Sequence, residues 1–430
     1  MSASGTVAPS PDEIGTREDL VGAAYRYPGE IEAIRRGIAT FVQREVIPRQ
    51  EANSELFEDP RRMYGADRKQ CPEVRALVRE VRETSARAGY YTMCTPTALG
   101  GGGLGHLAYF AAWERVYHLC GGRHYLGQHV IAHWATGPSP VLGKLSERAK
   151  LEVLPRLVSG EASMCFGLSE PGAGSDATRI STQARPHAEG WRISGTKIWT
   201  TNSPTADYVI VFAVTDPGAA ASGRGGISAF LVPTDAPGFH VEQVIRMWGS
   251  VGGDEAVLTF DDVRVEAHQL VGEMGRGFDI AMLGVNLGRI YNSARAVGVS
   301  RWALETAFDY IKIRQAFGHA IAEYQGVTFP LADSLTDMHA ARLMAVNVAR
   351  MLDDGLPARK EMSMTKGFAV RAAVRAIDNA IQAHGAMGVT NEMGLTDAYA
   401  ALRNVNIADG SNEILRRAIV KDALAGDTAV

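Results

Sequence analysis

The sequence predicts an α+β multidomain protein, in which a helical region, a small β-rich region and a second helical region follow one another. Apolar residues recur at helical spacing before about residue 161 and again after about residue 273. Between these positions, β-branched and aromatic runs alternate with turn-forming clusters. We therefore expect a flexible N-terminal segment over residues 1–26, an all-α domain over 27–161, a β domain over 162–272 and a helical-bundle domain over 273–430.

Two helices are predicted in the first helical region, because apolar residues share one face at intervals of three and four. These residues are Ile31, Ile34, Ile38 and Phe41 in the first helix, and Val74, Leu77, Val78 and Val81 in the second. A glycine cluster at residues 100–105 interrupts the pattern. It lacks a preceding strand and the dinucleotide-binding context, so we predict a loop there rather than a phosphate-binding turn.

The β-rich region is predicted from short runs that favour extended structure. They include Ile193, Ile198 and residues 208–214, 227–232 and 257–260. Turn-forming clusters such as Asp216-Pro217-Gly218 separate the runs. The following residues, 218–226, are rich in Ala, Ser and Gly and predict a surface loop.

Helical spacing returns in the last region and predicts a helical bundle. The residues that share helix faces are Leu304, Ala307, Phe308 and Ile311 in one helix, Leu331, Leu335, Met338, Ala341, Ala345 and Val348 in a second, and Val374, Ile377, Ile381 and His384 in a third. His384 lies on an apolar face, so we interpret it as a packed side chain rather than a catalytic one.

Composition excludes several classes of function. The net charge of −4, without a dense Lys/Arg cluster, argues against nucleic-acid binding. No apolar stretch approaches about 18 residues, and residues 1–14 resemble neither a signal peptide nor a transit peptide, so we predict a cytoplasmic protein without a membrane span. The four cysteines form no Cys-x-x-Cys or His-rich pattern, which predicts reduced thiols and no metal site.

A segment at residues 165–176 has the composition of a ligand-binding turn. It reads Cys-Phe-Gly-Leu-Ser-Glu-Pro-Gly-Ala-Gly-Ser-Asp, which predicts a strand running into a turn of small residues. Small residues permit close approach to a flat or anionic ligand, and the Ser169 and Ser175 hydroxyls can donate hydrogen bonds to it. A tight hairpin with solvated serines explains the composition equally well.

The string at residues 169–176, Ser-Glu-Pro-Gly-Ala-Gly-Ser-Asp, closely resembles the first signature of the acyl-CoA dehydrogenase family. Residues 197–202, Lys-Ile-Trp-Thr-Thr-Asn, are similar to the Trp-x-Thr segment of that family. The resemblance extends over residues 30–421. It implies an acyl-CoA dehydrogenase-like fold with an N-terminal helical domain, a middle β-barrel or sandwich domain and a C-terminal four-helix-bundle domain.

The resemblance implies FAD as cofactor and places residues around it. Phe166, Leu168 and Ser169 would line the flavin, and Trp199, Thr200 and Thr201 would flank its ring. Ser175 would contact the cofactor and lie along the pantetheine chain of the acyl-CoA. Without the resemblance, Trp199 is better explained as a core aromatic residue of the β domain.

Two further strings imply cofactor contacts, and the first of them implies a contact across a subunit interface. Residues 314–318, Arg-Gln-Ala-Phe-Gly, resemble the Arg-x-x-Phe-Gly segment, so that Arg314, Phe317 and the nearby Gln325 would reach FAD in a neighbouring subunit. The same residues can form a helix C-terminus capped by Gly318, and both interpretations can hold. Gln382 and Gly385 fall in a string similar to the Gln-x-x-Gly-Gly segment near the FAD pyrophosphate, with Ala386 replacing the second glycine. The family precedent implies a homotetramer, a dimer of dimers.

Abstraction of an α-proton from a thioester requires a carboxylate over one face of Cα. Many family members place Glu before Gly-Thr near the C-terminus, and the matching residue here is Asp409, one methylene shorter. A shortfall of about 1 Å can cost on the order of 100-fold unless the backbone or the substrate moves closer. Asp409 could alternatively cap the following helix. A second branch carries its base just before an Arg, but the matching residue is Gly288, which leaves Asp409 without a rival.

The resemblance also implies neighbouring contacts. Arg289 and Gly410 would lie near the acyl group, while Ser411 and Glu413 would contact the cofactor. Asn286 replaces an Asp that often contacts the acyl-CoA in the family. The backbone N–H of Asp409 and a ribityl hydroxyl would polarise the thioester carbonyl.

The predicted activity is α,β-dehydrogenation of an acyl-CoA, with an electron-transfer flavoprotein as electron acceptor. A nitroalkane oxidase-like enzyme, which also has Asp at the base position, is the first alternative. A weakly catalytic FAD- or acyl-CoA-binding partner subunit and an enzyme acting on a carrier-protein-tethered acyl group are the others. The sequence leaves the acyl group's length, branching and ring character open.

Overall fold

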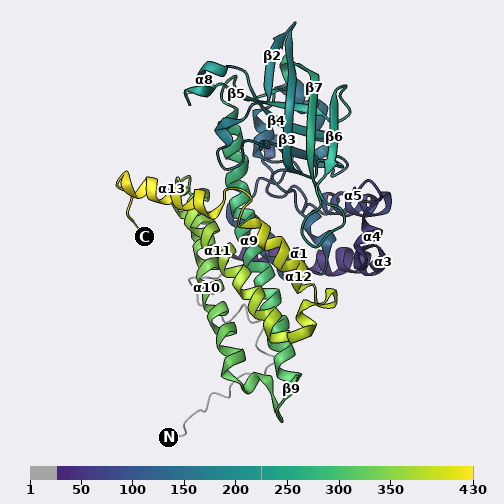
Figure 1. Cartoon of the computed structure of the whole chain (residues 1–430), viewed down its shortest axis with the longest axis vertical. Coiled ribbons are helices and arrows are strands. Elements are labelled where there is room, and N and C mark those ends of the chain that lie inside the picture. Colours follow the sequence, from purple (N-terminus) through teal and green to yellow (C-terminus); the bar gives the residue numbers. More distant parts are fainter. Residues whose placement is uncertain (1–26, 224, 430) are drawn as a thin grey trace.

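The computed structural model describes residues 27–223 and 225–429, so the segment expected at residues 1–26 lies outside the described residues. The order of elements is helical, β and helical, as the sequence predicts. Figure 1 shows the β domain at one end of a long helical bundle, with the N-terminal helices α3, α4 and α5 to one side.

The N-terminal helical region confirms both predicted helices. Its α-helices are α1 (Gly29–Phe41), α2 (Ile47–Glu51), α3 (Ser54–Glu58), α4 (Pro60–Met63), α5 (Pro72–Arg87), α6 (His106–Cys120) and α7 (Glu147–Val158). Shorter turns are the π-helix η3 (Val42–Val46) and the 3₁₀-helices η4 (Thr97–Leu99), η5 (Tyr125–His129) and η6 (Pro140–Lys144). The glycine cluster after η4 forms a loop, as predicted.

The middle region is an eight-stranded sheet in which seven strands follow the order β6-β7-β3-β2-β4-β5-β8, and β1 pairs in parallel with β4. The strands are β1 (Met164–Gly167), β2 (Gln183–His187), β3 (Gly190–Thr201), β4 (Tyr208–Val214), β5 (Ile227–Pro233), β6 (Phe239–Val244), β7 (Glu255–Glu266) and β8 (Leu270–Val271). The sequence predicts parts of β1, β3, β4, β5 and β7. It misses β2 and β6, whose exposed faces carry many polar residues, and the two-residue strand β8.

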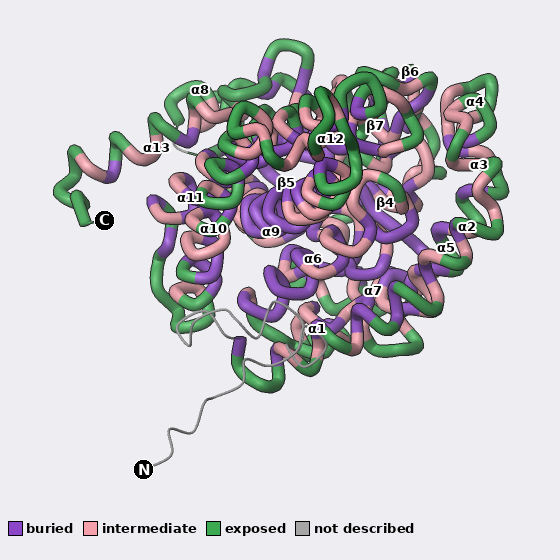
Figure 2. The backbone as a smooth tube through the Cα atoms, turned by 90° about the horizontal axis from the view of Figure 1, so that it is seen from below, coloured by how far each residue is buried: buried purple, intermediate pink, exposed green. Residues whose placement is uncertain are grey.

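The C-terminal region is the predicted helical bundle. Its elements are α9 (Gly277–Ile313), the two-stranded hairpin β9 (Gln315–Ala316) and β10 (His319–Ala320), the turn η9 (Ile321–Glu323), α10 (Gln325–Asp353), α11 (Arg359–His384), η10 (Gly385–Val389), η11 (Asn391–Met393), α12 (Leu395–Val405) and α13 (Asn412–Leu424). Figure 2 shows α9 in the buried interior, whereas α8 (Pro217–Ala221) and α13 lie largely exposed at the periphery.

A buried charge cluster joins the two helical regions. The Glu114 carboxylate on α6 accepts hydrogen bonds from the Tyr27 hydroxyl at 2.8 Å and from Arg342 on α10 at 2.6 Å. Arg35 on α1 lies 3.7 Å from the same carboxylate. Paired buried charges specify which helices meet, because an unpaired carboxylate here would be costly. The N-terminal helices and the bundle are thus fixed against each other around α9, which carries the candidate site. No helix in the described part of the chain combines the length and apolarity needed to cross a bilayer.

Candidate active site

The turn between α12 and α13 presents the predicted base, Asp409. Asp409 has φ +53° and Gly410 has φ +95°, so both residues adopt the left-handed conformation. Asp tolerates this region better than most residues, and Gly adopts it freely. Ser411 is the N-cap of α13, and its side chain accepts a hydrogen bond from the Ile414 backbone N–H. The alternative in which Asp409 caps α13 is therefore wrong, and its carboxylate remains available for another role.

Three side chains from two other helices hold this turn. Lys366 on α11 donates hydrogen bonds of 2.9 Å to the carbonyl oxygens of Ala408 and Gly410, on either side of Asp409. Arg289 on α9 donates from Nε to the Asp409 carbonyl oxygen at 3.2 Å. Asn292 donates from Nδ2 to the Asp409 carboxylate oxygen Oδ2 at 2.7 Å. Together they fix both the backbone and the carboxylate of Asp409.

Electrostatics poise the Asp409 carboxyl for proton transfer. Burial raises its pKa to about 6, although the positive charges of Lys366 and Arg289 and the Asn292 hydrogen bond oppose the shift. Burial likewise lowers the pKa of Lys366 to about 8. A carboxylate with a pKa near 6 is ionised at neutral pH yet a stronger base than a solvated Asp, which suits it to general-base catalysis.

We expect Lys366→Met to shift the pH dependence of any reaction in which Asp409 acts as the base. Removal of the nearby positive charge disfavours the carboxylate and raises the pKa of Asp409. The reaction needs ionised Asp409, so the midpoint of its rise with pH should move upward from about 6. The measurement is the rate of anaerobic flavin reduction between pH 5 and 9.

Lys360→Met is the matched control, because Lys360 is also on α11 but bonds Asp427 near the C-terminus. It should leave the midpoint unchanged. An unchanged midpoint in Lys366→Met would show that the Lys366 charge does not act on the base.

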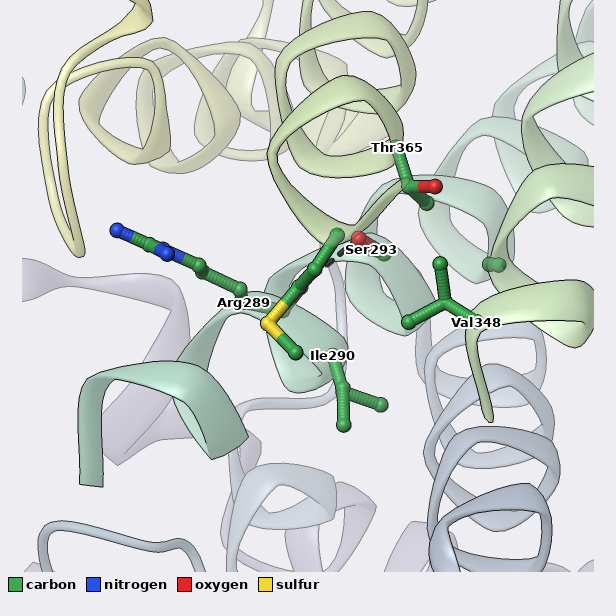
Figure 3. Close-up of a pocket in the computed structure, with 7 residues that line it drawn as sticks. Arg289, Ile290, Ser293, Val348 and Thr365 are labelled. Carbon is green, nitrogen blue, oxygen red and sulfur yellow. Dashed lines mark hydrogen bonds between the residues drawn. The ribbon is translucent and has the colours of Figure 1, made fainter. Parts of the chain in front are cut away.

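The Arg289 side chain is directed toward the Asp409 turn. Figure 3 shows it extending away from a small cavity inside the bundle that Ile290, Ser293, Val348 and Thr365 help to line. Arg289 is the only charged residue among the residues lining this cavity.

Asn286, the position where the family often has Asp, contacts Arg289. Its Oδ1 atom accepts a hydrogen bond from the Arg289 NH1 group at 3.3 Å. A neutral amide therefore orients the guanidinium here, and Asn286 acts on the Asp409 turn through Arg289.

The two signature segments lie side by side. The Ile198 N–H donates to the Ser169 carbonyl oxygen at 3.0 Å, and Lys197 donates to the Leu168 carbonyl oxygen at 3.1 Å. Glu170 accepts from Lys197 at 2.7 Å, and both side chains are almost fully buried. A buried ion pair thus locks the turn at residues 170–176 onto β3.

We expect Lys197→Met to destabilise the fold and weaken retention of the cofactor. It leaves the Glu170 carboxylate buried without its cation, and breaking such a pair costs about 3–5 kcal/mol. The free energy of unfolding from urea titration and the FAD content after gel filtration are the measurements. Lys312→Met, which removes a lysine from an exposed pair with Asp309, should change stability by about 0.5 kcal/mol or less. Equal stability losses in the two variants would contradict the role of the buried pair.

Trp199 is not a core residue of the β domain. Its side chain is 56% exposed, its φ is +60°, and the β3–β7 register shifts between Lys197 and Thr200. The core interpretation is therefore wrong, and the irregularity turns a large aromatic ring outward. Among the described residues, the neighbouring Thr200 hydroxyl is buried and has no hydrogen-bond partner. An exposed indole beside an unsatisfied hydroxyl fits a flat, polar-edged cofactor such as FAD.

The remaining residues of the signature turn lie around this surface. Phe166, Leu168 and Ser169 are half-buried, whereas Ser175 and Thr201 are exposed. Ser411 is half-buried and Glu413 is exposed on the first turn of α13.

The other predicted cofactor residues lie at the far end of the bundle. Arg314 ends α9 as an exposed C-cap residue, and from Arg289 to Arg314 the helix advances about 37 Å. Phe317 is 94% exposed, and Gln325 begins α10. Figure 1 shows β9 at the end of the bundle opposite the β domain. Gly318 lies in the β9–β10 turn rather than at the helix cap, so the capping interpretation fails for it.

Gln382 and Gly385 are exposed near this same end, where α11 terminates. The adjacent His384 is packed as expected, since its ring stacks on Tyr310 at 4.5 Å and its Nδ1 contacts the Ala380 carbonyl oxygen. One chain thus holds two separate groups of predicted cofactor residues.

Sequence reasoning missed Asn292, Lys366 and Trp134, all of which lie beside Asp409. Asn292 follows Gly288 by one helical turn, so a scan of that face could have found it. Lys366 and Trp134 come from other elements, and no local pattern marks them.

Comparison with known proteins identifies the family. Family models for the N-terminal, middle and C-terminal domains of acyl-CoA dehydrogenase match residues 28–161, 165–263 and 275–424. The chain therefore belongs to the acyl-CoA dehydrogenase family. It is an oxidoreductase that acts on CH–CH bonds, and its cofactor is FAD.

Individual relatives agree with this assignment. An acyl-CoA dehydrogenase of Bacillus subtilis is 37% identical over 331 residues, 77% of this chain and 86% of the relative. The human mitochondrial short-chain specific acyl-CoA dehydrogenase is also 37% identical, over 77% of this chain and 79% of the relative. A solved glutaryl-CoA dehydrogenase from Mycobacterium smegmatis in complex with FADH2 has a TM-score of 0.80 at 25% identity, and the match covers 95% of this chain and 98% of that one.

Proposed function

We propose that the enzyme converts an acyl-CoA thioester to the trans-2-enoyl-CoA, with Asp409 as the base that takes the Cα proton. A hydride leaves Cβ as the Cα–Cβ double bond forms, so that two hydrogens are removed in all. The observation that carries the proposal is the Asp409 carboxylate held by Asn292, with a pKa raised to about 6 by burial. A fixed carboxylate of this basicity is what abstraction of a weakly acidic C–H proton requires.

Bound FAD supplies the acceptor for the hydride. Phe166, Leu168 and Ser169 on and after β1 would line it, together with Trp199, Thr200 and Thr201 at the end of β3. The two segments are already joined by the hydrogen bond from the Ile198 N–H to the Ser169 carbonyl oxygen. Ser175, Ser411 and Glu413 complete the proposed contacts to cofactor and pantetheine from neighbouring turns.

The thioester carbonyl must be polarised so that the α-proton becomes acidic enough to remove. We assign this role to the backbone N–H of Asp409. Arg289 and Lys366 fix the peptide groups on either side of that N–H, and Gly410 leaves space beside it. Asn286 would contribute by orienting Arg289.

The second group of predicted cofactor residues supports a shared site. Arg314, Phe317 and Gln325, with Gln382 and Gly385, are exposed at the end of the bundle opposite Asp409. Arg314 is separated from Arg289, beside Asp409, by about 37 Å of helix α9. We infer that the residues of this second group contact FAD held by another copy, in a homotetramer arranged as a dimer of dimers. A cytoplasmic electron-transfer flavoprotein would reoxidise the enzyme.

Anaerobic titration of the purified yellow protein with a panel of acyl-CoAs tests the proposal. Bleaching of the flavin by at least one acyl-CoA, with the enoyl-CoA as product, is the expected result. Bleaching by nitroethane alone would establish a nitroalkane oxidase-like reaction instead. A bound flavin that neither compound reduces would indicate a binding subunit, and reduction only by an acyl carrier protein thioester would establish a tethered substrate.

A further inference from the structure

Trp134 lies in the loop between η5 and η6, which the surrounding structure holds in place. The Ala132 N–H donates to the Tyr91 carbonyl oxygen at 2.7 Å, and the Met164 N–H donates to the Thr136 carbonyl oxygen at 3.0 Å. The second bond connects the loop to the start of β1. The Trp134 side chain is only 6% exposed, so its position is fixed by packing rather than by solvent.

Two glycines of α9 make room for the Trp134 indole. A Cβ atom added to Gly284 would lie 2.6 Å from the indole ring, and one added to Gly288 would lie 2.7 Å from the indole Nε1. Neither position can carry a side chain while the ring is there. On another side, the Trp134 ring packs edge-on against Phe166, with 5.0 Å between ring centroids. The indole therefore packs both against α9 at Gly284 and Gly288 and against Phe166, a residue of the proposed flavin site.

The indole lies directly beside the proposed base. The Cβ position of Gly288 is 2.4 Å from the Asp409 Oδ2 atom and 2.7 Å from the Trp134 Nε1 atom. The Trp134 Nε1–H group is buried and has no hydrogen-bond partner in the described structure. A ring so close to the carboxylate borders the space beside the proposed base.

We propose that Trp134 determines the acyl-chain specificity of the enzyme by closing the acyl site beside Asp409, which restricts the substrate to short acyl thioesters. This inference rests on the proposed function. A chain that extends beyond the reacting carbons and along α9 would meet this large, buried ring. Removal of the ring widens the site along Gly284 and Gly288, which carry no side chains of their own. Hydrophobic pockets discriminate between acyl chains by about 10-fold or more for each methylene that cannot be accommodated.

The test measures binding without turnover, in the Asp409→Asn background. Butanoyl-CoA and octanoyl-CoA are titrated by calorimetry into this protein with and without Trp134→Ala. We expect octanoyl-CoA to bind at least about 10-fold more weakly than butanoyl-CoA to the parent, and Trp134→Ala to strengthen octanoyl-CoA binding by about 10-fold or more. Trp134→Phe, which keeps an aromatic ring, should retain the discrimination. Trp191→Ala, at the opposite end of β3 from Trp199, should not alter it.

The outcomes separate the inference from the function on which it rests. Equal binding of both thioesters to the parent, or unchanged binding in Trp134→Ala, overturns the inference alone. Failure of every acyl-CoA to bind or to bleach the native enzyme overturns the proposed function. If Trp134→Ala does not fold, Trp134→Leu replaces it. Thermal unfolding gives an independent check. Gly284→Ala should lower the Tm of the native protein, because the added methyl group meets the indole. In a protein that already carries Trp134→Ala, the same substitution should lower the Tm much less.

Discussion

Asp409→Asn is expected to lower the rate of flavin reduction by an acyl-CoA by at least about 100-fold while the protein keeps its FAD. General-base catalysis contributes about 10²–10⁴-fold, and an amide cannot accept the Cα proton. The amide can still accept the Asn292 hydrogen bond through its oxygen, so the turn should keep its geometry. Stopped-flow measurement of flavin absorbance under anaerobic conditions gives the rate.

Asp309→Asn is the matched control, since Asp309 is an exposed carboxylate that pairs only with Lys312 in the described structure. In the Asp309→Asn variant, an acyl-CoA should reduce the flavin at the native rate. A native rate in Asp409→Asn itself would remove Asp409 from the reaction. In the native enzyme the rate should rise with pH through about 6 and level off above it, because only the ionised carboxyl is active.

The order of domains follows from sequence because each region has its own periodicity. Helical spacing in α1, α5, α10 and α11 arises from faces that pack against one another, and the short strands β4 and β5 are buried on both faces. The segment after Asp216 differs from the expected turn and loop. Asp216 accepts a hydrogen bond from the Ala219 N–H and caps the short helix α8 (Pro217–Ala221). Asp followed by Pro suits a helix start as well as a turn, so local sequence could not decide between them.

Residues of the site could be predicted only where a short run of sequence resembles a segment of the family. Asp409 and Arg289 were found because their neighbours in sequence resemble family segments. Two side chains from other helices set the behaviour of Asp409. Asn292 is marked in the sequence only by its place one helical turn after Gly288, and no local pattern marks Lys366. Long-range contacts of this kind depend on how α9, α11 and the α12–α13 turn meet, which periodicity does not specify. The exposure of Trp199 could not be predicted for a similar reason, because it depends on a register shift between β3 and β7.

Gly288→Ala is expected to reduce the rate of flavin reduction by about 100-fold. The added methyl group would lie 2.4 Å from the Asp409 Oδ2 atom and 2.7 Å from the Trp134 Nε1 atom. Heavy atoms do not approach this closely, so the carboxylate or the ring must move, and a misplacement of about 1 Å can cost 10²-fold. Stopped-flow reduction by butanoyl-CoA, together with the FAD content, measures the effect.

Gly367→Ala provides the comparison that separates steric displacement from the gain in helix propensity. Gly367 is also a helical glycine, on α11, but its Cβ would lie 3.7 Å from Leu415 Cδ1, an ordinary contact. Both variants gain up to about 1 kcal/mol of helix propensity, yet only Gly288→Ala should lose activity. Full activity in Gly288→Ala would mean that the carboxylate is free to move without consequence. The absence of a side chain at residue 288 would then have nothing to do with the placement of the base at residue 409.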